Sequence, residues 1–370
     1  MRIGIDVRSL AHNLTGVQRY TFSLIEALFK IDKENQYILF PREINQTGSN
    51  TGKRKNLLLG IARWTKVASW EQFFLPLDAL YRSIDAFHFP ACAAPLLFPC
   101  PYVVTIHDMI YQLHPEKTIP SFRAYLNIMT PLIARKAKRI ITVSHNSKKD
   151  IMRLLNIPGD KISVIYQAIS EVFRPVRDST LLQRILGKYQ ISSNYIFTVG
   201  TLEPRKNIVR LIRAFSILKH LKQYDGQLVI AGAKGWFYDE IFKVVEGLNL
   251  KKDVVFTGYV PDRELVYLYN GARIFVFPSL YEGFGLPPLE AMSCGVPVIA
   301  SRISSLPEVV TDAAILVNPY DFNELAATIA DLLHDEKLQT DLIETGFRNI
   351  QRFSWDKVAR DTLAVYNSIA

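Results

Sequence analysis

Two glutamates, Glu282 and Glu290, stand out because a segment rich in glycine and proline separates them, within YEGFGLPPLEAMSCGVPVIAS (residues 281–301). The glycines between them leave room for the backbone to approach a ligand closely. The proline pair at 287–288 marks the start of a helix, whose first turn should hold Glu290. Because a helix start offers N–H groups and a positive dipole end, the segment predicts a site for an anion or for sugar or ribose hydroxyls. The alternative is that both glutamates merely cap the helix.

Two further charged turns follow predicted strands. VGTLEPRKN (199–207) presents Arg205 and Lys206 at the start of a helical pattern. Two cations beside backbone donors suit a diphosphate, although a solvated helix start has the same appearance. YVVTIHD (102–108) ends in His107 and Asp108. A lone histidine at a strand end is usually structural, so its type alone assigns no role.

Short apolar runs and helical patterns alternate along the whole chain. The runs predicted as strands lie at 2–7, 36–40, 85–89, 102–108, 139–144, 162–166, 195–200, 227–232, 254–260, 274–279, 297–301 and 314–318. Helical patterns lie at 16–29, 65–82, 120–138, 145–155, 207–222, 236–247, 262–271, 287–294, 321–334, 336–351 and 353–370, and 42–56 reads as a mobile loop. Continuous apolar strands separated by helices predict parallel sheets covered on both faces, hence two doubly wound α/β domains. We expect the domains at 1–170 and 171–352, with a terminal helix at 353–370. Ligands of such sheets bind beyond the carboxyl ends of the strands.

Composition and missing motifs exclude several classes of protein. Apolar residues make up 49% of the 370 positions and charged residues 21%, which excludes a disordered chain. Three cysteines without a CxxC pair exclude a disulfide framework and favour a reducing compartment. No strand-linked GxGxxG, no GxxxxGK[ST] and no metal-ligand spacing occur, which disfavours nicotinamide, P-loop and metal chemistry. The chain opens on a strand rather than a signal sequence, and four prolines deny a helix to the uncharged stretch 89–106, so we expect no membrane span.

Positive charge is concentrated in the first half of the chain. Residues 1–175 hold 23 lysines and arginines against 13 acidic residues, a net +10, whereas residues 176–370 carry a net −1. An anionic membrane surface, a phosphorylated substrate or nucleic acid could match this charge, as could a solubilising bias. ARKAKR (134–139) and the aromatic segment RWTKVASWEQFF (63–74) suit a membrane or acceptor surface. The alternatives are a solvated charge run and aromatic residues of the core.

Taken together, the motifs resemble the retaining, nucleotide-sugar-dependent glycosyltransferases of family 4. The resemblance rests on IGIDVRSL…TGVQRYT, VVTIHD, IITVSHNSKKDI, VGTLEPRKN, LVIAGAKGW, VVFTGYVPD and the glutamate segment with its continuation SSLPEVV. It implies the GT-B fold, in which two Rossmann-like domains face one another and a C-terminal helix crosses back to the first.

The resemblance also implies roles for individual residues. Glu290 would bind the nucleotide ribose, Glu282 the donor sugar, and His107 would lie near the transferred sugar. Many relatives carry arginine directly after the glycine of VGT, where this chain has Thr201, so Arg205 is expected to supply the guanidinium. The implied catalytic residues are His107, Glu282, Lys206 and Arg205. The expected donor contacts are Gly16, Gly200, Arg205, Lys206, Val260, Glu282, Phe284, Gly285, Leu286 and Glu290.

The function expected from the resemblance is transfer of a hexose from a nucleotide diphosphate sugar to a hydroxyl of a glycan or lipid-linked acceptor. GDP-mannose is the preferred donor, because the opening segment resembles bacterial enzymes of surface-glycan synthesis. No metal, cofactor or nucleic acid is expected, and the protein is expected in the cytoplasm, in peripheral contact with the membrane. Residues expected to meet acceptor or membrane are Asp108, Arg135, Lys136, Lys138 and Arg139. Another GT-B enzyme (a phosphorylase or an epimerase) and a non-catalytic sugar-nucleotide-binding subunit remain as alternatives.

Overall fold

The computed structural model describes residues 1–11, 16–41, 57–59, 70–117 and 120–369. Contacts divide the chain into two compact units, residues 1–168 with 353–370 (unit 1) and residues 169–352 (unit 2). The loop expected at 42–56 lies outside the described residues, as does the first part of the helix expected at 65–82. Among the described residues, no helix is both long and apolar enough to cross a bilayer.

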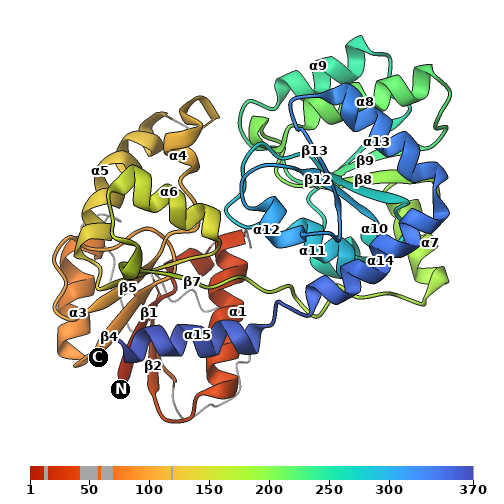
Figure 1. Ribbon diagram of the computed structural model, residues 1–370. Coiled ribbons are helices and arrows are strands. Elements are labelled where there is room, and N and C mark those ends of the chain that lie inside the picture. Colours follow the sequence, from red (N-terminus) through yellow and green to blue (C-terminus); the bar gives the residue numbers. More distant parts are fainter. Residues whose placement is uncertain (12–15, 42–56, 60–69, 118–119, 370) are drawn as a thin grey trace. The chain divides into compact units, whose positions relative to one another are not determined.

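Unit 1 is built on a seven-stranded parallel sheet with the order β3-β2-β1-β4-β5-β6-β7 (Figure 1). Its strands are β1 (Arg2–Asp6), β2 (Gln36–Phe40), β3 (Leu57–Leu59), β4 (Ala86–Phe89), β5 (Tyr102–Thr105), β6 (Arg139–Thr142) and β7 (Ile162–Val164). Its helices are α1 (Gly16–Ile31), α3 (Leu75–Tyr81), α4 (Ile110–Leu113), α5 (Pro120–Lys136), α6 (His145–Leu155) and α15 (Trp355–Asn367). The central strands β4 and β5 are buried along their whole length, hence on both faces, which explains why they read as continuous apolar runs.

The C-terminal helix α15 belongs to unit 1. Ser354 caps it by accepting a hydrogen bond from the N–H of Lys357, and the helix packs against α1 (Figure 1). Its apolar face includes Val358 and the fully buried Tyr366. The chain therefore leaves unit 1 at residue 168 and returns to it at residue 353.

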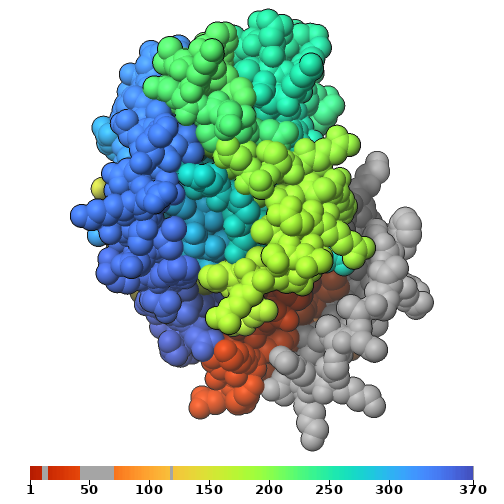
Figure 2. Space-filling model, turned by 90° about the vertical axis from the view of Figure 1, so that its right-hand side faces the viewer, coloured from red at the N-terminus to blue at the C-terminus, as the bar shows by residue number. Residues whose placement is uncertain are grey.

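Unit 2 contains a six-stranded parallel sheet with the order β10-β9-β8-β11-β12-β13. Its strands are β8 (Tyr195–Val199), β9 (Gln227–Ala231), β10 (Val254–Gly258), β11 (Ile274–Phe277), β12 (Val298–Ser301) and β13 (Ile315–Val317). Its helices are α7 (Ser179–Lys188), α8 (Ile208–His220), α9 (Asp239–Gly247), α10 (Asp262–Asn270), α11 (Leu286–Ser293), α12 (Leu306–Val310), α13 (Phe322–His334) and α14 (Glu336–Ile350). Figure 2 shows one helical face of this unit, with α7 in yellow-green and α14 in blue on its two sides.

The predicted strands all occur, most of them one or two residues shorter than expected. Sequence analysis missed β3, α4, α7 and α12. Three of these, β3, α4 and α12, are only three, four and five residues long, too short for a periodic pattern to emerge. Each sheet reverses its strand order once, between β1 and β4 and between β8 and β11. In open parallel sheets such reversals mark the ligand-binding edge.

Candidate active site

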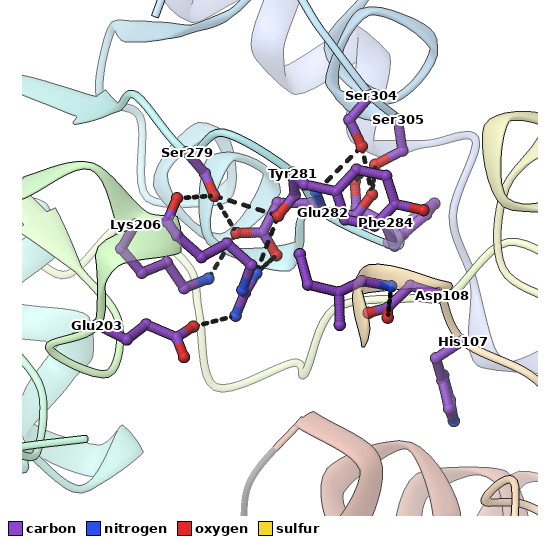
Figure 3. A network of polar contacts seen from close by, with 12 residues as sticks. His107, Asp108, Glu203, Lys206, Ser279, Tyr281, Glu282, Phe284, Ser304 and Ser305 are labelled. Carbon is purple, nitrogen blue, oxygen red and sulfur yellow. Dashed lines mark hydrogen bonds and ion pairs between the residues drawn. The ribbon is translucent and has the colours of Figure 1, made fainter. Parts of the chain in front are cut away.

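The carboxylate of Glu282 is the centre of the candidate site in unit 2. Glu282 comes shortly after β11, at the carboxyl edge of the sheet, and is only 9% exposed. Its Oε1 lies 2.6 Å from Nζ of Lys206 and accepts a hydrogen bond of 2.7 Å from the Ser279 hydroxyl. The guanidinium of Arg205 lies 2.7 Å from Oε2. Figure 3 shows Lys206 and Ser279 converging on this carboxylate.

The two cations come from a short 3₁₀ turn, Pro204–Lys206, between β8 and α8. Asn207, in the left-handed conformation at φ 59°, ends this turn. Its side-chain amide donates to the carbonyl oxygens of Pro278 (3.0 Å) and Pro319 (2.7 Å). The N–H of Leu280 in turn donates to the carbonyl of Arg205 at 2.8 Å. The loop after β8 is thus fastened to the loop after β11, at the point where the strand order reverses.

A second carboxylate, Glu203, completes the cluster. It is 1% exposed, and its Oε1 forms an ion pair with Arg205. The other carboxylate oxygen, Oε2, is buried without a hydrogen-bond partner among the described residues. With Arg205, Lys206, Glu203 and Glu282 all ionised, two positive and two negative charges cancel.

Burial and pairing act in opposite directions on this cluster. Burial disfavours the charge on Glu282, but the attraction of Arg205 and Lys206 outweighs it and lowers the pKa of that carboxyl to about 2. For Lys206, burial and the repulsion of Arg205 lower the pKa despite the attraction of Glu282. The site therefore keeps its two cations although burial disfavours their charged form. Such an arrangement is more typical of a ligand-binding site than of an ion-pair cluster that stabilises the fold.

Glycines allow the chain to pass close to these side chains. A Cβ atom on Gly200, which follows β8 with φ +154°, would lie 3.0 Å from Cε of Lys206. A Cβ on Gly232, which follows β9 with φ +145°, would lie 2.0 Å from the carbonyl oxygen of Gly200. A larger residue would collide with the backbone at position 232, whereas at position 200 it would crowd the Lys206 side chain and strain the backbone.

Two serines hold the glycine-rich segment between the glutamates. The Ser304 hydroxyl donates to the carbonyl of Glu282 at 2.6 Å and accepts from its N–H at 3.0 Å. The Ser305 hydroxyl lies 2.9 Å from the carbonyl oxygen of Glu282 and 2.7 Å from that of Phe284 (Figure 3). Gly285 then takes φ +113° as the N-cap of α11, with no room for a Cβ beside Leu306. These contacts fix the helix start at Leu286.

Glu290 lies deeper than expected. Because α11 begins at Leu286, one residue earlier than expected, Glu290 is its fifth residue and lies just past the first turn in which it was predicted. It is 5% exposed, and its Oε2 accepts a hydrogen bond of 2.8 Å from the hydroxyl of Tyr269 on α10. It is therefore no helix cap; a buried residue of α10 orients its carboxylate.

In unit 1, His107 follows β5 and is held by neighbours on both sides. Its Nε2 donates to the carbonyl of Pro90 at 2.9 Å, and its Nδ1 accepts from the Gln167 amide at 3.3 Å. The ring of Tyr20 meets it edge-on, with centroids 4.9 Å apart. Burial lowers the pKa of His107, so the ring is neutral at physiological pH.

Asp108 and the basic cluster lie at opposite edges of the sheet of unit 1. Asp108 follows the carboxyl end of β5, where its carboxylate accepts from the N–H of Ile110 at the start of α4. The four cations Arg135, Lys136, Lys138 and Arg139 end α5 and open β6, at the amino edge. The cluster therefore does not lie at the carboxyl edge, where ligands of parallel sheets bind, because its cations precede a strand instead of following one.

Val260 and Gly16 are two other residues expected to contact the donor. Val260 is buried in the short connection between β10 and α10. Gly16 is the first residue of α1, in open space, and the loop before it lies outside the described residues. Within the described ranges, no three His, Cys, Asp or Glu side chains gather so as to hold a metal ion.

Sequence reasoning missed the residues that orient the predicted ones. These are Tyr20, Gln167, Glu203, Tyr269, Ser279, Ser304 and Ser305. Glu203, Ser304 and Ser305 lie within the segments quoted for the resemblance, so the sequence did offer a signal for these three residues. Tyr20 also stands inside a quoted segment, TGVQRYT, but nothing in that segment indicates its contact with His107.

Comparisons with known proteins identify the family. The model of glycosyl transferases group 1 matches residues 185–349, and that of glycosyltransferase family 4 matches residues 14–171. The chain is 32% identical to O-antigen chain mannosyltransferase B of Escherichia coli, over 99% of each chain. It is 34% identical to the E. coli serotype-specific mannosyltransferase WbdA over 70% of this chain, but spans only 32% of that protein.

Solved structures resemble the whole chain. Sucrose-phosphate synthase from Thermosynechococcus elongatus superposes with a TM-score of 0.79 at 21% identity, covering 99% of this chain and 98% of that one. Anabaena HepE in complex with UDP-glucose gives a TM-score of 0.78 at 18% identity, covering all of both chains. These likenesses confirm the expected GT-B fold. With the full-length match to an O-antigen mannosyltransferase, they show that the chain belongs to the group 1, family 4 glycosyltransferases.

Proposed function

We propose that this glycosyltransferase moves mannose from GDP-mannose to a hydroxyl of a growing surface polysaccharide, with retention of the anomeric configuration and without a metal ion. The observation that carries the proposal is the charge-neutral cluster of Arg205, Lys206, Glu203 and Glu282 at the reversal between β8 and β11. The names of three relatives support mannose: two act on O-antigen, and one from Mycolicibacterium hassiacum is an alpha-(1->4)-mannosyltransferase.

The cluster suits a ligand that brings negative charge and hydroxyl groups together. A nucleotide diphosphate sugar carries two negative charges on its phosphates, which can take over Arg205 and Lys206 from Glu282. Both cations can reach a ligand, because their side chains are 20% and 12% exposed. Glu282, released from them, can then accept hydrogen bonds from sugar hydroxyls. Glu290, oriented by Tyr269, is the proposed ribose ligand.

The chemical step places growing negative charge on the departing diphosphate while the sugar ring becomes oxocarbenium-like. Arg205 and Lys206, with the N–H groups of Phe284, Gly285 and Leu286 at the start of α11, are the preorganised donors for that charge. We propose that the acceptor hydroxyl attacks on the side that the diphosphate leaves. Its proton then passes to a phosphate oxygen, so the chain needs no protein nucleophile.

The remaining contacts follow the resemblance. Gly200 gives the phosphates access to the backbone, the backbone near Val260 meets the base, and Gly232 lines the pocket of the base. His107, neutral and fixed in orientation, would contact the transferred sugar through a hydrogen bond rather than as a general acid. Gly16 would stand where donor phosphate and acceptor approach α1.

A thermal-shift screen tests the donor directly. Ligand binding stabilises a protein by RT ln(1 + [L]/Kd), so GDP should raise the melting temperature more than UDP, ADP or dTDP at equal concentration. Glu290→Gln should weaken this shift, whereas Glu308→Gln, a partly buried glutamate on α12 of the same unit, serves as the matched control. Equal shifts with all four nucleotides would contradict the choice of GDP.

We also propose that unit 1 meets an anionic membrane that carries the acceptor. Its support is a set of exposed apolar side chains on η2 (Trp70–Phe74), α3, α5 and the loop before β5: Phe73, Phe74, Leu77, Leu80, Tyr81, Leu97, Phe122, Tyr125, Ile128 and Leu132. Phe73 and Phe74, at the end of the aromatic segment 63–74, are therefore exposed and not part of the core. Arg63, Trp64 and Lys66 of the same segment lie outside the described residues.

Hydrogen bonds connect α5, the loop before β5 and η2, and the surface proposed here is the exposed part of these elements and α3. Lys136 at the end of α5 donates to the carbonyl of Leu96 at 2.6 Å, and the N–H of Leu96 donates to Gln72 on η2 at 3.0 Å. The surface includes the exposed cations Arg135, Lys136 and Lys138, and α5 itself carries no acidic residue. Apolar side chains beside cations are typical of proteins that bind anionic lipid surfaces.

Flotation with vesicles tests the membrane contact. Binding to vesicles with anionic lipid should exceed binding to neutral ones and weaken with salt, since exposed charges are screened within about 8 Å at physiological ionic strength. Ile128→Ser should reduce binding, and Leu221→Ser, equally exposed in unit 2, should not. Equal binding to both vesicle types, or to neither, would refute the proposal.

A further inference from the structure

A chain of buried hydrogen bonds runs from the C-terminal helix into the sheet of unit 1. The hydroxyl of Tyr366 on α15 lies 2.7 Å from Nδ1 of His88 on β4, and Nε2 of His88 lies 2.8 Å from Oγ1 of Thr105 on β5. The hydroxyl of Tyr20 on α1 lies 3.5 Å from the same Thr105 oxygen. All four side chains are at most 1% exposed.

This series of hydrogen bonds ends at residues that neighbour His107. Thr105 precedes His107 by two residues, and His88 precedes Pro90, whose carbonyl accepts from His107, by two residues. The His88–Thr105 bond therefore joins β4 and β5 just before the point where Pro90 and His107 meet. Tyr20, the last member, packs its ring edge-on against the His107 ring at an interplanar angle of 87°.

The titratable side chains in this series of hydrogen bonds stay neutral at physiological pH. Burial lowers the pKa of His88 to about 3 and raises the pKa of Tyr20 to about 12, and it raises the pKa of Tyr366 as well. The neutral ring of His88 has one nitrogen that carries a hydrogen and one that does not. The first donates to a hydroxyl and the second accepts from the other hydroxyl, so both nitrogens have a hydrogen-bond partner. Such a fully satisfied buried network is rigid, and the loss of one hydroxyl leaves a buried nitrogen without a partner.

We propose that Tyr366 and His88 are positioning residues, through which helix α15 fixes the place and orientation of the His107 ring. The kinetic part of this inference rests on the proposed contact of His107 with the transferred sugar. It gives the C-terminal helix a role in the reaction beyond covering α1, because a single hydroxyl on it completes the hydrogen bonds behind that histidine.

The test uses Tyr366→Phe, which removes only the hydroxyl, and Thr105→Val, which removes the next member while keeping the side-chain shape. Tyr102→Phe is the matched control: it removes the hydroxyl of another buried tyrosine, on the same strand as Thr105, where that hydroxyl donates to the carbonyl of Ile133. Two readouts are taken for each variant. One is GDP release from GDP-mannose, and the other is the ¹H–¹⁵N spectrum of the imidazole rings, with the His107 signals identified by their loss in His107→Gln.

We expect Tyr366→Phe and Thr105→Val to lower kcat about tenfold, with KM for GDP-mannose nearly unchanged, because misplaced groups slow the reaction more than they weaken binding. Both should shift the His107 ring signals, and Tyr102→Phe should do neither. Unchanged ring signals in Tyr366→Phe, or the same kinetic loss in Tyr102→Phe, would overturn the inference. A wild-type rate in His107→Gln would instead overturn the proposed role of His107, and the ring signals would then decide the positioning alone.

Discussion

Replacing Glu282 by glutamine tests the electrostatics of the site most simply, because it removes one charge and almost no volume. In the folded protein the pKa of Glu282 is about 2, against an ordinary value of 4.5. At 1.36 kcal/mol per unit, this difference corresponds to about 3 kcal/mol of stability at neutral pH. The side chain is 9% exposed, so solvent screens little of this energy.

The sign of the pH dependence follows from the lowered pKa. The stabilisation is complete above the unfolded pKa near 4.5 and is lost as the pH falls toward the folded value of about 2. Linkage gives about 2 kcal/mol remaining at pH 3.5. Glu282→Gln should therefore lower the free energy of unfolding by about 3 kcal/mol at pH 7 and by about 2 kcal/mol at pH 3.5.

Urea unfolding followed by circular dichroism at both pH values measures this difference. Glu246→Gln is the control, because Glu246 pairs with Lys251 on the surface of the same unit, and exposed pairs contribute little. A destabilisation by Glu282→Gln below 1 kcal/mol at pH 7, or one equally large at both pH values, would refute the reasoning.

Three other outcomes follow from the same site. Glu282→Gln should bind GDP about tenfold more tightly than the wild type while losing transferase activity, because the diphosphate no longer competes with a carboxylate for Arg205 and Lys206; titration calorimetry with weaker or equal binding would contradict this. Lys206→Ala should lower kcat about 10²–10³-fold, since its contact strengthens as the diphosphate leaves, and steady-state rates within threefold of wild type would be incompatible with that role. Glu290→Ala should act mainly by raising KM for the donor, which initial rates over a range of donor concentrations would show; a fall in kcat alone would assign it another role.

Much of the fold could be predicted because each strand is a continuous apolar run bounded by turns. The glutamate segment is a good example: its glycines, its proline pair and its helix all occur within one residue of the expected positions. Glu290 lies one residue further along the helix than expected, because the sequence shows prolines at 287–288 but not that Gly285, with φ +113°, caps a helix that already begins at Leu286.

The remainder of the site depends on contacts between residues far apart in the sequence. Nothing local to Glu282 indicates that Ser304 will hold its backbone, and nothing near His107 indicates Pro90 or Gln167. The position of the basic cluster at 134–139, in contrast, could have been predicted from the sequence. Cations that precede a parallel strand must lie at the amino edge of the sheet, and those that follow one at the carboxyl edge.

The claim that this chain transfers mannose with retention and without metal is tested most directly by one NMR time course. GDP-α-mannose is incubated with the wild-type protein and an oligomannoside acceptor in the presence of EDTA, and the anomeric signals are followed from the first turnover. The account predicts acceptor-dependent release of GDP and a new α-linked mannose. A β-linked product, or turnover that begins only when Mg²⁺ or Mn²⁺ is added, would contradict it.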